Sequence, residues 1–230
     1  MFLGIGIVGF LSGCATTPLD SGYTGPFHKI GNYYLINQKL PPEIRRVAML
    51  PLTTTQTSHA ALAGRETFGP ILYGELTKSR VFEVLRVSED KLSQWTGKVG
   101  WSAHDELPAD FLAKLREQTA CDAILFSELS YYRAYPPVAI GWRLLLVKAD
   151  DGEVLWSVDE IFDAGEPQVM NSARRYALEN ERANAELARE AGSRTGPLFQ
   201  NKVPGLDWLN SPTQFAKYSA NAAIETLSVK

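Results

Sequence analysis

Cysteine is scarce in this 230-residue chain, which contains only Cys14 and Cys121. Because Cys14 lies in a segment that we expect to serve export, no disulfide framework can hold the fold together. Cys121 precedes an apolar run, and no neighbouring cation would lower the pKa of its thiol. We therefore predict that Cys121 is a small buried core residue rather than a nucleophile.

The chain also lacks an excess of positive charge. Its 23 Lys and Arg residues against 26 Asp and Glu residues give a formal net charge of -3 and a pI near 5.7. Binding to a phosphate backbone needs a basic field on the protein surface. Nucleic acid is therefore not an expected partner.

Patterns that carry catalysis or bind metals are missing as well. The three histidines, His28, His59 and His104, fall in segments that we expect to be solvated loops, and their spacing fits no zinc site. The nucleophile elbow G-x-S-x-G and the phosphate loop G-x-x-x-x-G-K-S/T are absent too. We expect no metal, no cofactor and no enzymatic activity. An unrecognised envelope enzyme stays open, with His104 and Asp105 as the residues to test.

The amino terminus carries an export signature. Residues 1–13 are almost wholly apolar and too short to span a bilayer, which is typical of the apolar region of a signal peptide, although no Lys or Arg precedes it. The next residues, Leu11-Ser12-Gly13-Cys14, resemble the lipobox of bacterial lipoproteins. The resemblance implies a lipidated, palmitate-bearing Cys14. Because Ala15 rather than Asp follows, it also implies an outer-membrane anchor facing the periplasm.

The same segment matches a nucleotide-binding pattern by letter only. Gly4-Ile5-Gly6-Ile7-Val8-Gly9 fits G-x-G-x-x-G. That fingerprint requires a strand before it and a helix after it, so that pyrophosphate lies at a helix amino terminus. A first glycine at residue 4 leaves no room for the strand, and we expect no nucleotide.

Beyond the signal peptide we expect a flexible tether, 14–44, and a globular domain, 45–230. The tether is rich in Gly, Pro, Thr and Asn, with room for one edge strand. In the domain, apolar runs and alternation predict strands over 47–52, 82–87 and 123–129, and a hairpin over 141–149 and 154–162. Helical periodicity and capping residues predict helices around Phe68 to Leu76, after Ser88, after Asp110 and after Ser211.

A long polar helix from Pro167 to about Ala191 belongs to a helical insertion at about 167–205. Its apolar face is thin, chiefly Met170, Ala173, Ala177 and Leu187. The order of elements predicts an α/β domain with a mixed β-sheet flanked by helices in three layers, plus this long polar helix.

Two regions are candidate contact surfaces. Clustered Tyr and Arg beside a Pro-Pro corner are favoured at protein interfaces, and this chain has Tyr131, Tyr132, Arg133 and Tyr135 before Pro136-Pro137. Equally, these aromatics could cover a sheet edge within the molecule, and the same alternatives hold for Trp101. The second region is the polar helix with Arg174 and Arg175.

The strands and the hairpin, taken in order, resemble the curli-secretion lipoprotein family (CsgG-like) and its relatives among penicillin-binding-protein activator lipoproteins (LpoB-like). The carrying runs are Val47 to Leu52, Phe82 to Leu85, Cys121 to Phe126, Asp151 to Ser157 and Ala222 to Glu225. The resemblance implies a domain like the amino-terminal domain of TolB and non-enzymatic work in envelope assembly, through an envelope protein partner or self-association. The alternative is a subunit of an oligomeric export channel.

Overall fold

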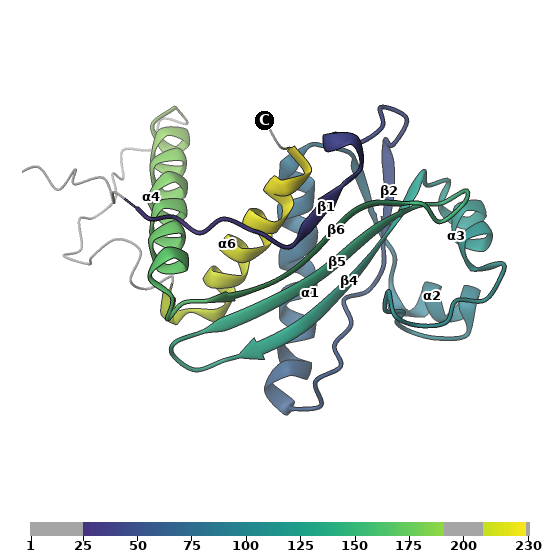
Figure 1. Cartoon of the computed structure of the whole chain (residues 1–230), viewed down its shortest axis with the longest axis horizontal. Coiled ribbons are helices and arrows are strands. Elements are labelled where there is room, and N and C mark those ends of the chain that lie inside the picture. Colours follow the sequence, from purple (N-terminus) through teal and green to yellow (C-terminus); the bar gives the residue numbers. More distant parts are fainter. Residues whose placement is uncertain (1–24, 191–208, 229–230) are drawn as a thin grey trace, which may run out of the picture.

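The structure, a computed structural model, describes residues 25–190 and 209–228. The strands are β1 (Tyr33–Leu35), β2 (Arg46–Met49), β3 (Glu83–Arg86), β4 (Ala123–Arg133), β5 (Ala139–Lys148) and β6 (Val154–Asp163). They form one six-stranded sheet in the order β1-β6-β5-β4-β2-β3 (Figure 1). β2 runs parallel to β3 and β4, and the other pairs are antiparallel. The predicted mixed sheet and the hairpin are confirmed.

The helices are α1 (His59–Ser79), α2 (Glu89–Thr96), α3 (Phe111–Thr119), α4 (Pro167–Glu190) and α6 (Pro212–Glu225), with 3-10 turns η1 (Ile36–Gln38) and η2 (Thr226–Ser228). Ser88 and Ser211 cap α2 and α6 as predicted, because each hydroxyl accepts from the backbone N–H three residues on. Pro70 lies in the interior of α1. The Ser58 hydroxyl caps α1, so the helix begins well before the predicted stretch around Phe68 to Leu76.

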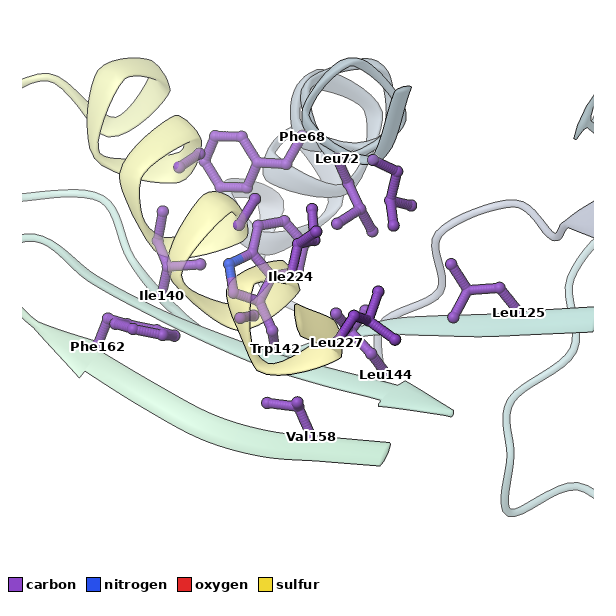
Figure 2. Packing of buried hydrophobic residues seen from close by; sticks show 14 of the residues in the cluster. Phe68, Leu72, Leu125, Ile140, Trp142, Leu144, Val158, Phe162, Ile224 and Leu227 are labelled. Atoms are coloured by element: carbon purple, nitrogen blue, oxygen red, sulfur yellow. The ribbon is translucent and has the colours of Figure 1, made fainter. Parts of the chain in front are cut away.

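The larger core lies between the sheet and the helices α1 and α6. Trp142 of β5 and Phe68 of α1 are fully buried in it, with ring centroids 6.3 Å apart (Figure 2). Two indole N–H groups fasten α6 to the sheet: Trp142 Nε1 donates to Ser219 Oγ and Trp156 Nε1 donates to Thr226 Oγ1, each at 2.8 Å. Each buried indole therefore has its polar atom satisfied.

A smaller core lies on the opposite face of the sheet. Alternate residues of β2 point to it, and α2 and α3 cover it with Leu92, Phe111 and Leu115. Cys121 is buried there as a free thiol, as predicted, and burial raises the pKa of that thiol. With helices on both faces, the domain has three layers, which confirms the predicted fold class.

Strand β4 is longer than predicted. The sequence indicated a strand ending near Leu129, but pairing with β5 continues to Arg133. A bulge lies between Leu129 and Tyr131, and it shifts the alternation of inward and outward side chains by one residue. Because of that shift, the alternating pattern in the sequence ends near Leu129, four residues before the strand itself ends.

The polar helix α4 forms as predicted and packs through its first half. Val169, Ala173 and Ala177 are fully buried, whereas Leu187, which we assigned to the apolar face, is exposed. Tyr176 of α4 donates from its hydroxyl to the buried Glu75 of α1 at 3.2 Å. The apolar contact of α4 therefore belongs to its first three turns.

Glu225, at the carboxyl end of α6, gives a pH prediction. Burial raises the pKa of this carboxyl; Arg175 of α4 lowers it and Glu179 of α4 raises it. A raised folded-state pKa stabilises the fold below the unfolded value, near 4.3, and this stabilisation is lost as the pH rises through the folded value. We therefore expect Glu225→Gln to raise the melting temperature at pH 7. The gain should stay below about 1 kcal/mol because the Glu225 side chain is exposed and solvent screens its charge.

Thermal unfolding of the full chain at pH 7 and pH 4 measures this effect. The gain of Glu225→Gln over the parent should disappear at pH 4, where the parent carboxyl is protonated too. Glu179→Gln serves as the matched control, with a smaller gain of the same sign at pH 7. An equal gain at both pH values would assign the effect to packing and contradict the prediction.

Within the predicted tether, residues 26–44 pack against the domain. β1 pairs with the edge of β6, and Leu35, Leu40 and Ile44 are buried. Closer to the amino terminus, the backbone N–H of His28 donates to Gln168 O and Ser172 Oγ. The expected flexibility is therefore wrong for this part of the segment, because long-range contacts hold it. The boundary between tether and domain stays a prediction.

Candidate functional site

One half of the sheet has a face that no helix covers among the described residues. The contacts of α2 and α3 with the sheet end at Phe126 and Leu145, and β4, β5 and β6 continue well beyond them (Figure 1). We call the surface beyond this limit the open face. It consists of Tyr34, Glu128, Tyr131, Arg133, Gly141, Arg143, Ser157, Asp159, Ile161 and Asp163. The strand register places all of them on one side.

A row of three charged residues crosses the open face. Glu128, Arg143 and Asp159 lie opposite one another on β4, β5 and β6. Arg143 donates from Nε to Asp159 Oδ2 at 2.9 Å and from Nη1 to Glu128 Oε1 at 3.3 Å. These carboxylates, Asp159 first, raise the pKa of the guanidinium. Glu128 is only 3% exposed, and the Ser102 hydroxyl donates to its other oxygen at 3.0 Å.

A second ion pair lies at the end of the hairpin. Arg133 donates from Nη2 to both oxygens of Asp163 at 2.8 Å and from Nε to the carbonyl of Pro137 at 2.7 Å. The Asp163 carboxylate raises the pKa of this guanidinium. Both arginines of the open face are therefore held in place and neutralised by carboxylates of the same face.

Apolar side chains lie beside these pairs: Ile161 lies in the row between them, and Tyr34 lies opposite Ser157 on the far side of the Asp159 row. Tyr34 is 49% exposed and Ile161 is 50% exposed. Gly141 lies between Tyr131 and Ile161 in the register. A Cβ on Gly141 would lie 2.6 Å from Ser130 Oγ and 2.9 Å from the backbone nitrogen of Tyr131, so the bulge requires glycine there. The open face therefore combines exposed apolar side chains with arginine–carboxylate pairs whose charges balance.

The structure divides the predicted aromatic cluster. Tyr131 and Arg133 lie on the open face, and Tyr135, 71% exposed, lies in the turn that follows. Tyr132 points to the other face, where its ring meets Phe68 edge to face at 5.0 Å. Burial raises the pKa of the Tyr132 hydroxyl. Tyr132 therefore belongs to the core, because the bulge between Leu129 and Tyr131 places Tyr132, rather than Tyr131, on the same face of the sheet as Leu129.

The other predicted contact residues lie elsewhere. Trp101 is buried in the smaller core against Phe111, which argues against a contact role for its ring. Arg174 and Arg175 are on α4, and Arg175 lies 4.4 Å above the ring of Phe27. Cys14 lies outside the described residues, and its lipidation stays a prediction.

Sequence reasoning missed most of the open face. Tyr34 lay in the predicted tether, and Ile161 lay in an apolar run that indicated a hairpin strand without showing which of its residues are exposed. One signal was available: Ser157, Asp159, Ile161 and Asp163 form an alternating polar series with one apolar member. The register of the strands was needed to bring that series next to Arg143 and Tyr131.

The histidines do not assemble a reactive site among the described residues. His28 is not the solvated loop residue that we expected: its Nε2 lies 3.4 Å from Glu160 Oε1, and its ring meets Phe162. His59 starts α1 instead of lying in a loop, whereas His104 is an exposed loop residue. Asp105 is held by Lys98, whose ammonium lowers the pKa of that carboxyl.

Two features are absent from the described part of the chain. It contains no group of three or more His, Cys, Asp or Glu side chains placed to hold a metal ion. None of its helices is both long and apolar enough to cross a membrane.

No protein-family model matches the chain, and no curated protein matches its sequence. Solved structures match its fold. A lipoprotein from Neisseria meningitidis has 16% identity, covers 65% of this chain and 99% of its own, and has a TM-score of 0.39. The NMR structure of LpoB from E. coli has 14% identity, with 70% and 82% covered and a TM-score of 0.36. TolB from Acinetobacter baumannii has 9% identity, with 69% and 31% covered and a TM-score of 0.30. These likenesses concern the α/β fold and carry no function to this chain.

Proposed function

We propose that this protein is a lipid-anchored lipoprotein of the bacterial envelope that acts without catalysis, by binding a protein partner on its open face. The observation that carries the proposal is the exposure of Tyr34 and Ile161 on a sheet face that no described helix covers. Interfaces favour large side chains of this kind on a surface whose other side chains are already held in place.

The charge arrangement supports a polypeptide partner. Arg133 and Arg143 are each paired with carboxylates of the same face. A strongly charged ligand would have to compete with these pairs, whereas a mixed protein surface gains apolar contact without breaking them. The partner surface that fits is therefore nearly neutral and contains apolar side chains.

The lipobox at Cys14 supports an outer-membrane location facing the periplasm. Because the segment from Pro26 packs on the domain, 11 residues (15–25) separate Cys14 from the packed part. Fully extended, they reach at most about 40 Å. A partner of the open face would thus act close to the membrane, in cell-wall synthesis or the assembly of surface structures. The export-channel alternative stays a prediction without a supporting observation.

Photo-crosslinking in cells tests the open face. Benzoylphenylalanine in place of Ile161 should give one discrete cross-linked partner. The same group in place of Leu62, an exposed residue of α1, should not. Tyr34→Ala combined with Tyr131→Ala should reduce the yield from position 161 more than tenfold, because apolar contact of the kind that anchors interfaces is lost. Equal partner capture from both positions would contradict the proposal.

The anchor needs its own measurement. Intact-mass analysis of the processed protein should give a chain that begins at Cys14 and carries acyl chains. Cys14→Ser should abolish that mass and release the protein from the membrane fraction. An unmodified amino terminus on the membrane-associated protein would refute lipidation without affecting the open face.

A further inference from the structure

The strand β3 forms an edge of the sheet that has no strand beyond it among the described residues. Its inner side is used: Glu83 N donates to Arg45 O at 2.7 Å and Val87 N donates to Met49 O at 3.0 Å. Because the N–H and C=O groups of a strand alternate in direction, those of Val84 and Arg86 point away from the sheet. They offer a short row of backbone donors and acceptors to another strand.

Hollows lie at both ends of this edge. At the start of β3 a groove with a cavity volume of about 660 Å³ has an apolar floor that includes Ile44, Phe82 and Leu227. At the end of β3 a cleft of about 400 Å³ lies beside Arg86 and Leu52. A strand added to the edge would thus find room for side chains at both of its ends.

The edge carries unpaired positive charge, most of it in the first groove. Lys39 and Arg45 line the first groove, which has no acidic lining residue. Arg86 lines the second, where Glu66 and Glu89 also lie but are both paired with Arg65. None of the three cations forms an ion pair within the described chain. Glu83, the acidic residue of β3, is already paired with Arg46 at 3.0 Å.

We infer that the β3 edge is a second interaction surface, which binds an extended acidic segment of a protein partner by adding it to the sheet as a strand. The backbone of Val84 and Arg86 supplies the pairing, the two hollows receive apolar side chains, and Lys39, Arg45 and Arg86 attract carboxylates. This division of labour is the usual one in strand addition, where backbone bonds give affinity and pockets give specificity.

A second copy of the chain fits the edge less well. A two-fold antiparallel pairing must match outward-facing residues, so Val84 of one copy would lie opposite Val84 or Arg86 of the other. The latter register puts both Arg86 side chains on the same face of a four-residue ladder, where like charges repel. An acidic peptide meets the same side chains with opposite charge.

The test uses the full chain and two synthetic peptides of eight residues with blocked ends. One alternates valine and glutamate, and the other alternates valine and lysine. Amide chemical shifts during titration should move and saturate around Val84 and Arg86 with the glutamate peptide. The lysine peptide should bind at least fivefold more weakly. No saturation by 10 mM, or equal binding of both peptides, would overturn the inference.

Variants separate the backbone contribution from the charge. Val84→Pro removes one outward N–H but none of the bonds to β2, and it should abolish binding. Arg86→Glu should weaken binding of the glutamate peptide at least fivefold and strengthen binding of the lysine peptide. Lys29→Glu makes the same charge change at an exposed position outside both hollows and should leave binding unchanged. Concentration-dependent self-association that Val84→Pro removes would assign the edge to a second copy and refute the peptide partner.

Discussion

Replacing Trp142 with alanine is expected to lower the free energy of unfolding by about 3–5 kcal/mol, the cost of removing a large aromatic side chain from a packed core. Trp142 is fully buried and points from β5 toward α1 and α6 (Figure 2). The substitution leaves a cavity between sheet and helices and removes the hydrogen bond to Ser219 of α6. Urea and thermal unfolding should show the loss, the latter as a decrease of about 10 °C in melting temperature.

Two matched variants separate the contribution of the packed volume from that of the hydrogen bond. Trp142→Phe keeps most of the packed volume and loses the N–H, while Ser219 Oγ retains its bond to the carbonyl of Ala216. It should cost about 1–2 kcal/mol. Ser219→Ala strands the buried indole N–H and should cost about 1–3 kcal/mol for the same reason. If Trp142→Ala cost no more than Trp142→Phe, the central place of Trp142 in the core would be refuted.

Local patterns in the sequence predicted most elements of the fold. The hairpin of β5 and β6 was predictable because Asp151-Gly152 supplies a turn between two apolar runs, and Gly152 does have a positive φ of 76°. The helices α2 and α6 were predictable because Ser88 and Ser211 are capping residues followed by apolar periodicity. Each of these signals lies within a few residues of the structure that it predicts.

What the sequence did not predict depends on distant parts of the chain. β1 and His28 are held by residues more than a hundred positions away, so no local pattern could show that this part of the tether packs. The bulge places Tyr132, rather than Tyr131, on the core side of β4, and a bulge interrupts the alternation by which a strand is identified. The open face exists because α2 and α3 cover only one end of the sheet, which requires the assembled topology.

The same dependence on distant residues gives the second large prediction. Arg143→Met should lower the free energy of unfolding by about 2 kcal/mol, because it leaves the buried carboxylate of Glu128 without its cation. Breaking a fully buried pair costs about 3–5 kcal/mol. The value should be smaller here because Arg143 is 31% exposed and Ser102 still donates to Glu128. Urea unfolding of the full chain measures it.

A double variant decides whether the cost comes from the stranded charge. Adding Glu128→Gln to Arg143→Met removes that charge and should recover at least half of the loss. Asp159→Asn breaks only the more exposed pair of Arg143 and should cost less than about 1 kcal/mol. If the double variant recovered nothing, the destabilisation would come from the lost packing of the Arg143 stem. In that case the row formed by Glu128, Arg143 and Asp159 would not be the source of rigidity in the open face. The partner site would instead depend on the apolar core beneath it.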